Sequence, residues 1–139
     1  MIIQLMLIGF SILGILISFY FTLVSYRIIE PDIRFIPRFC RMDERSCFVI
    51  IDAPDARLFG VPNALLGILY YISILVFMVT MPGNSESLQY QILVSISAGT
   101  VLLGAYLVYV LFVKLRTPCP LCLISHGMNL GIFLILLAY

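Results

Sequence analysis

Four long apolar runs constrain this chain more than any other feature of its sequence. They cover about residues 2–26, 61–81, 88–113 and 118–139. As an α-helix with a rise of about 1.5 Å per residue, each run is long enough to cross a hydrocarbon core of about 30 Å. Hydrophobic residues make up 63% of the chain and charged residues 11%, which is too little polar surface to cover a soluble globule. We therefore expect an all-α membrane protein, a bundle of four transmembrane helices.

The runs leave one long loop, residues 27–60, which we call the cap loop. Because the four spans use most of the 139 residues, we expect a single membrane domain over residues 1–139. The first run has no basic segment before it and no small-residue cleavage site after it, so we interpret it as a retained helix.

The cap loop carries most of the charge of the chain. It holds six Arg and six acidic residues, so its net charge is close to zero. This balance predicts a partly ordered, salt-bridged cap and argues against nucleic-acid binding, which would need one sign of charge. Apolar residues on both sides of its centre predict that the cap contacts membrane lipid.

The four cysteines form two pairs. Cys40 and Cys47 lie in the cap loop with six residues between them, and Cys119 and Cys122 form a C-x-x-C motif where the fourth run begins. Helices that alternate in direction place the cap loop and the hinge before Cys119 on one side, so the four sulfurs can meet. The free N–H groups and the dipole of a helix N-terminus favour a thiolate in the C-x-x-C motif.

Polar residues continue the face of the fourth run on which the cysteines lie. His126 is four residues after Cys122 and Asn129 is seven residues after it, so both share its helical face with Cys119. Polar groups within hydrocarbon are costly and usually functional. Asn63, at the start of the second run, could be either a helix cap or a ligand contact.

Three interpretations of the cysteines compete. A zinc site of four thiolates is one, but six residues between two ligands is an unusual spacing, and zinc would leave His126 and Asn129 unexplained. A small structural membrane protein with two inert disulfides is another. A C-x-x-C motif at a helix N-terminus is more typical of a redox pair, so we favour the third, a thiol–disulfide exchanger that passes electrons inward.

Three motifs in order resemble the vitamin K epoxide reductase family, in its prokaryotic disulfide-forming branch. They are the C-x6-C pair, the segment 59–67 with the sequence FGVPNALLG, and the C-x-x-C motif with the sequence CPLC. The resemblance covers nearly the whole chain. It implies a four-helix bundle around a quinone, of menaquinone or ubiquinone type.

The resemblance also implies a role for each cysteine. Cys40 would exchange disulfides with a thioredoxin-like partner, Cys47 would attack Cys119, and Cys122 would pass electrons to the quinone. Asn63 falls where the family has an asparagine that hydrogen-bonds a quinone oxygen. Because the chain has no fused thioredoxin domain, we expect the partner to be a separate protein.

Two residues depart from the family pattern. Ala53 stands where many members have a serine, and His126 stands where animal members have a tyrosine that faces the ligand. An imidazole can donate a hydrogen bond to a quinone oxygen or carry a proton. No residue implies epoxide reduction, so we expect quinone reduction coupled to disulfide formation.

The basic residues predict an orientation in the cell membrane. All eight Lys and Arg lie in the cap loop or in the hinge after the third run, on the cysteine side. Because short loops rich in Lys and Arg remain in the cytoplasm, this bias predicts that the cysteines face the cytoplasm. Disulfide chemistry more often lies outside the cytoplasm, although intracellular proteins of hyperthermophiles can be rich in disulfides. An extracytoplasmic cysteine side is the alternative.

Overall fold

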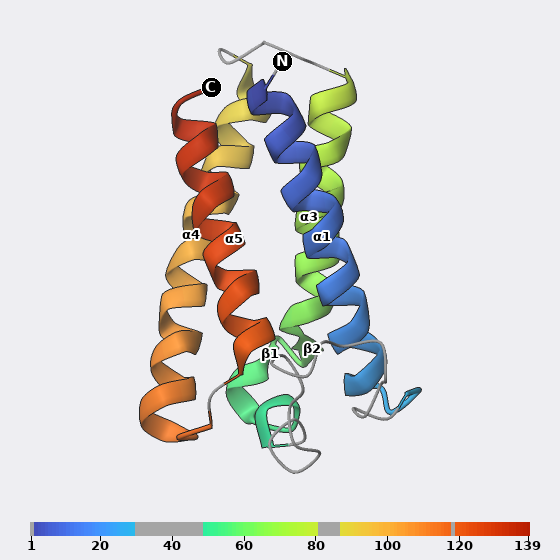
Figure 1. The fold of residues 1–139 in the computed structure, drawn as a ribbon, viewed down its shortest axis with the longest axis vertical. Helices are drawn as coiled ribbons and strands as arrows, with labels where there is room; N and C mark the ends of the chain where they lie inside the picture. Colours follow the sequence, from blue (N-terminus) through green and yellow to red (C-terminus); the bar gives the residue numbers. More distant parts are fainter. Residues whose placement is uncertain (1, 30–48, 81–86, 118) are drawn as a thin grey trace.

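Four long helices make up most of the described part of the protein (Figure 1). The computed structural model describes residues 2–29, 49–80, 87–117 and 119–139. In this part of the chain the long helices are α1 (Ile2–Ser25), α3 (Asn63–Thr80), α4 (Leu88–Tyr109) and α5 (Pro120–Leu137), and α4 continues as a short π-helix, η3 (Val110–Lys114). All four are long and apolar enough to cross a membrane, so the predicted bundle of transmembrane helices is confirmed.

The helices pack in two pairs, α1 along α3 and α4 along α5 (Figure 1). Both chain termini lie at one end of the bundle. The end of α1, the start of α3, the end of η3 and the start of α5 lie at the opposite end, which we call the cap end. The helix ends that the cap loop and the hinge connect therefore lie on the same side, as the sequence predicts.

The first helix ends in a left-handed residue. Arg27 has φ 56°, and the N–H of Ile28 donates to the carbonyl of Leu23 at 2.9 Å. This is the hydrogen bond of a Schellman motif, which satisfies a carbonyl that the helix end leaves free. Arg27 then forms an exposed ion pair with Asp52 of the cap loop, 3.0 Å between Nη2 and Oδ2, which contributes little to stability.

The described part of the cap loop contains a small hairpin that the sequence did not predict. After a 3-10 turn, η2 (Pro54–Ala56), the strands β1 (Arg57–Leu58) and β2 (Val61–Pro62) pair in antiparallel register. Phe59 and Gly60 between them both have positive φ, 53° and 80°, as a two-residue hairpin turn of this hand requires. Because β2 is paired with β1, helix α3 begins at Asn63 rather than at residue 61.

Residues 30–48 of the cap loop lie outside the described residues. Cys40 and Cys47 fall in this range, so their expected place beside Cys119 and Cys122 stays a prediction.

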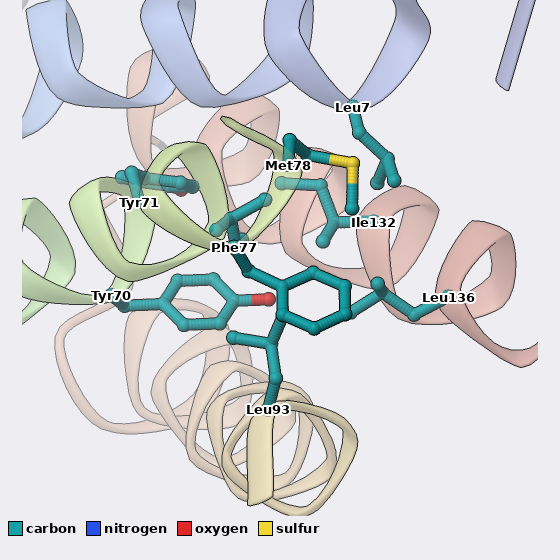
Figure 2. Packing of buried hydrophobic residues seen from close by; sticks show 9 residues of the cluster. Leu7, Tyr70, Tyr71, Phe77, Met78, Leu93, Ile132 and Leu136 are labelled. Atoms are coloured by element: carbon teal, nitrogen blue, oxygen red, sulfur yellow. The ribbon is translucent and has the colours of Figure 1, made fainter. Parts of the chain in front are cut away.

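Figure 2 shows the main hydrophobic core. Most of its residues belong to the parts of the four helices nearer the chain termini. Its buried residues come from all four helices and are Leu7, Tyr70, Tyr71, Ile74, Phe77, Met78, Leu93, Ile132 and Leu136. The helices α1 and α3 pack closely at Gly14, where a Cβ would overlap the ring of Tyr71. The other half of the bundle, toward the cap end, encloses a cavity.

Candidate active site

A cavity of about 500 Å³ lies inside the cap end of the bundle. Its volume falls within the range of about 300–1,000 Å³ that is typical of small-molecule sites. All four long helices and the described part of the cap loop line it, mostly with apolar side chains. The polar side chains of the wall include Ser18, Asp55, Asn63, Tyr70, Tyr71, Thr100, Cys122, Ser125, His126 and Asn129.

The C-x-x-C motif opens α5, as predicted. Cys119 is the N-cap residue, and its Sγ accepts a hydrogen bond from the N–H of Cys122 at 3.2 Å. Pro120 follows at the first helical position, where its missing N–H costs nothing. A disulfide joins Cys119 and Cys122, with 5.2 Å between their Cα atoms. Cys119 is fully buried and Cys122 lines the cavity, so Cys122 presents the pair to the cavity.

Two further polar residues of α5, His126 and Asn129, also line the cavity, but they differ in their hydrogen bonds. Asn129 accepts a hydrogen bond at Oδ1 from the hydroxyl of Tyr71, at 2.6 Å, so this carbonyl is occupied inside the protein. His126 has a buried Nδ1 with no partner among the described residues. A Cβ at Gly104 of α4 would lie 3.0 Å from this Nδ1, so the small size of Gly104 makes room for the imidazole.

Asn63 is the first residue of α3 and lines the same cavity. Its Nδ2 donates to the main-chain carbonyl of Asp55 at 2.9 Å. Because a carbonyl only accepts, this contact fixes which end of the amide faces Asp55. The other end, Oδ1, is buried and has no partner in the described part of the chain. The side chain thus bonds to the cap loop, and its contact with a ligand stays a prediction.

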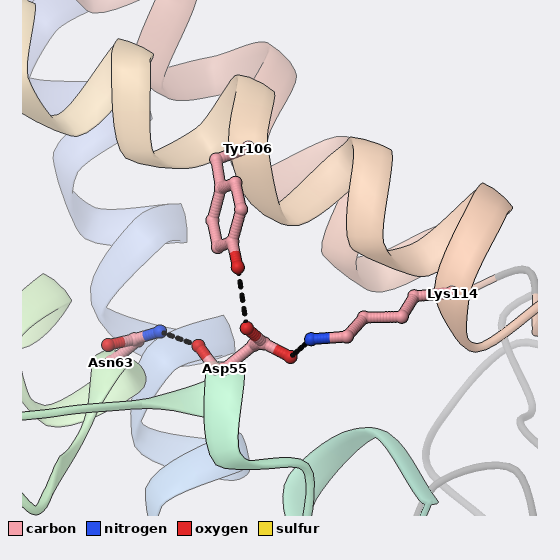
Figure 3. Close-up of polar contacts among 4 residues, drawn as sticks. All are labelled: Asp55, Asn63, Tyr106 and Lys114. Carbon is pink, nitrogen blue, oxygen red and sulfur yellow. Dashed lines mark hydrogen bonds and ion pairs between the residues drawn. The ribbon is translucent and has the colours of Figure 1, made fainter.

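Asp55 is the centre of a polar cluster that the sequence did not reveal (Figure 3). Its Oδ1 accepts from the hydroxyl of Tyr106 at 2.6 Å, and its Oδ2 accepts from Nζ of Lys114 at 2.7 Å. The hydrogen bonds from Lys114 and then from Tyr106 hold the pKa of the Asp55 carboxyl below its usual range. Through this hydrogen bond, Tyr106 of α4 binds the cap loop. In the sequence, the one indication of this cluster was Lys114, the basic residue directly after the third apolar run.

Ala53, which replaces the serine of many family members, is buried in the cavity wall. Its methyl group cannot make the hydrogen bond that a serine hydroxyl could make at this position.

A C-x-x-C disulfide that borders an apolar cavity within a transmembrane bundle defines the class, a membrane thiol oxidoreductase. The comparison with protein families narrows it: the family model described as "Vitamin K epoxide reductase family" matches residues 5–137, nearly the whole chain. The protein belongs to the vitamin K epoxide reductase family, whose members in general work with quinones. The comparison with curated proteins gives no match.

Proposed function

We propose that the protein is a thiol:quinone oxidoreductase of the prokaryotic branch, which makes disulfides in other proteins. The observation that carries this proposal is the position of Cys122, which joins the disulfide to the wall of a cavity large enough for a small ligand. Inert stapling disulfides or a zinc site would not need that cavity. Family membership supports redox chemistry over both alternatives.

The proposed sequence of exchanges begins in the cap loop. A thioredoxin-like partner gives up two electrons through Cys40, which leaves the partner oxidised and the Cys40/Cys47 pair reduced. The thiolate of Cys47 attacks Cys119, the Cys119–Cys122 bond breaks, and Cys122 leaves as a thiolate. Cys40 then displaces Cys119 from Cys47, so the loop pair is again a disulfide and the C-x-x-C pair is a dithiol.

The reduced C-x-x-C pair then passes two electrons and two protons to the quinone and closes again as a disulfide. Cys122 lies in the first turn of α5, where free N–H groups and the helix dipole favour a thiolate. The quinone leaves as a hydroquinone, so the cycle balances.

Asn63 and His126 are the residues that we propose hold the quinone head group. Each lines the cavity, and His126 has a buried Nδ1 without a partner among the described residues. Asn63 keeps a second N–H on Nδ2 that can donate to a quinone oxygen, whereas its unpartnered Oδ1 can accept only from a hydroxyl of the hydroquinone. Buried polar atoms are nearly always hydrogen-bonded, so such atoms are where the polar groups of a bound molecule are expected. The apolar remainder of the wall suits the ring and isoprenoid chain of a menaquinone or ubiquinone.

The variant Cys122→Ser tests the order of exchange. In this variant the Cys119 thiolate can attack Cys47 of the oxidised loop pair, and Cys40 leaves as a thiolate. Because no Cys122 thiol is present to break the new bond, a Cys47–Cys119 cross-link should accumulate in protein kept free of reductant. Peptide mass mapping after thiol blocking identifies the trapped pair, and Cys119→Ser, which should leave the loop pair without an acceptor, is the control. A trapped Cys40–Cys119 cross-link would overturn the assigned order.

We also propose that the cap end faces the cytoplasm. Arg27, Arg57, Lys114 and Arg116, the described basic residues, all belong to segments at the cap end (Figure 1), and the sequence places the other four Arg in the same loop. This charge bias supports a protein that oxidises cytoplasmic thiols.

A single cysteine tests that orientation. In a variant without the four native cysteines, a cysteine at position 85, in place of Ser85 between α3 and α4, should react with a membrane-impermeant maleimide on intact cells. Protection until the cells are lysed would instead place the native cysteines outside the cytoplasm.

A further inference from the structure

Asp55 uses all three of its oxygen atoms to join separate parts of the protein (Figure 3). Its carboxylate accepts from Tyr106 of α4 at 2.6 Å and from Lys114 of η3 at 2.7 Å. Its main-chain carbonyl accepts from Nδ2 of Asn63, the first residue of α3, at 2.9 Å. A single residue of the cap loop therefore links the end of the third span to the start of the second.

The cluster differs from an ordinary surface ion pair. In the other described ion pair of the cap loop, the side chains of Arg27 and Asp52 are 66% and 50% exposed. In the pair of Asp55 with Lys114, the lysine side chain is 59% exposed, but that of Asp55 is only 14% exposed and lies in the cavity wall. A charge-assisted hydrogen bond from Lys114 and a hydroxyl hydrogen bond from Tyr106 hold its carboxylate from different directions and so restrain its position. Because the carboxylate and the carbonyl belong to the same residue, fixing one restrains the other.

We propose that Asp55 is a positioning residue for the quinone site. Tyr106 and Lys114 hold its carboxylate. Its main-chain carbonyl in turn accepts from one N–H of Asn63 Nδ2, which orients the amide so that its second N–H can donate to a quinone oxygen. This inference rests on the proposed function, because it assigns a purpose to the orientation of Asn63. Lys114 also lies five residues before Cys119, so the same contact ties the cap loop to the hinge that precedes the C-x-x-C motif.

The variant Asp55→Asn tests the proposal with almost no change of volume. Its amide oxygen can accept from only one of the two donors, and its NH₂ group would face the Lys114 ammonium. The apparent KM for quinone and the dissociation constant of a non-reacting quinone analogue should both rise about three- to tenfold, with kcat changed less than twofold. Asp52→Asn is the matched control, because it is the same substitution in the exposed ion pair of the same loop.

A double-mutant cycle separates positioning from general support of the fold. If Asp55 acts through Asn63, then Asp55→Asn should weaken analogue binding in the wild-type background and have little further effect in the Asn63→Ala background. Equal effects in both backgrounds would overturn the proposal, since Asp55 would then act on the cavity by another route.

Variants on the other side of the cluster give an independent measurement should Asp55→Asn not fold. Lys114→Met should weaken analogue binding and Lys114→Arg should restore it, because arginine keeps the charge-assisted hydrogen bond. Tyr106→Phe should also weaken binding, and Tyr109→Phe on the same helix is its control. Binding that is the same in Lys114→Met, Tyr106→Phe and wild type would contradict the inference. If the wild-type protein itself binds no quinone analogue, the proposed function fails instead.

Discussion

The contact between Gly14 and Tyr71 gives the most direct prediction about packing. Gly14 of α1 lies against the ring of Tyr71 of α3, and a Cβ added at Gly14 would overlap that ring. Tyr71 is 1% exposed, and its hydroxyl donates to Asn129 at 2.6 Å. The ring therefore cannot move aside without giving up both its packing and this hydrogen bond, so Gly14→Ala should destabilise the protein.

The size of the effect follows from three contributions. Overfilling a packed site typically costs about 1–3 kcal/mol, and losing the Tyr71 to Asn129 hydrogen bond costs about 0.5–1.5 kcal/mol. Alanine favours a helix over glycine by about 1 kcal/mol, which offsets part of this cost. We therefore expect Gly14→Ala to lower the free energy of unfolding by about 2 kcal/mol.

Reversible unfolding in mixed micelles, followed by circular dichroism as the fraction of denaturing detergent rises, measures this free energy. The matched control is Gly9→Ala on the same helix, where an added Cβ meets nothing within 4 Å. The control should be as stable as wild type or slightly more stable. If Gly14→Ala proves as stable as Gly9→Ala, then α1 and α3 do not approach as closely at Tyr71 as described here.

Further predictions concern the quinone site. Gly104→Ala would put a Cβ 3.0 Å from Nδ1 of His126, so it should displace the imidazole by a few tenths of an ångström and raise the apparent KM for quinone; Gly127→Ala, whose Cβ meets nothing within 4 Å, should not. His126→Phe removes a proposed hydrogen bond worth about 1–3 kcal/mol, so it should raise that KM several-fold, and unchanged kinetics would return His126 to a packing role. Because the hydrogen bond from Lys114 lowers the pKa of Asp55, the contribution of the carboxylate is present above its usual pKa and is lost as the pH falls through the lowered one. The KM ratio of Asp55→Asn to wild type should therefore stay constant from about pH 8 to pH 5 and fall toward one only below about pH 4; a ratio that falls between pH 7 and 5 would contradict this assignment.

The transmembrane helices were predictable because their signal is local. In hydrocarbon every backbone polar group must be paired, and an unbroken apolar run of about 20 residues pairs them within itself as an α-helix. The first run, predicted at residues 2–26, forms α1 at Ile2–Ser25. The second run, predicted at about residues 61–81, contains α3 at Asn63–Thr80. The pairing of Val61 and Pro62 with β1 was not predicted, because it depends on a turn at Phe59 and Gly60 that needs positive φ at both positions.

The predicted and the missed parts of the site differ in the same way, because the predicted parts are local in sequence and the missed parts are not. Cys122, His126 and Asn129 share one face of α5 by helical spacing alone, and all three line the cavity. The cluster around Asp55 joins it to residues 51 and 59 positions further along the chain. Spacing within one helix carries no information about such contacts, because they depend on how α3, α4 and the cap loop pack together.

One measurement tests the central claim that the C-x-x-C pair passes its electrons to a quinone. Purified protein is reduced, freed of reductant under nitrogen and mixed with a water-soluble quinone, and the redox state of Cys119 and Cys122 is followed by mass after thiol alkylation. The account predicts that the disulfide between them returns only when quinone is added, with one hydroquinone formed per disulfide, and that neither product forms in Cys122→Ser. A C-x-x-C pair that stays reduced in the presence of quinone, or that oxidises equally fast without it, would contradict the account.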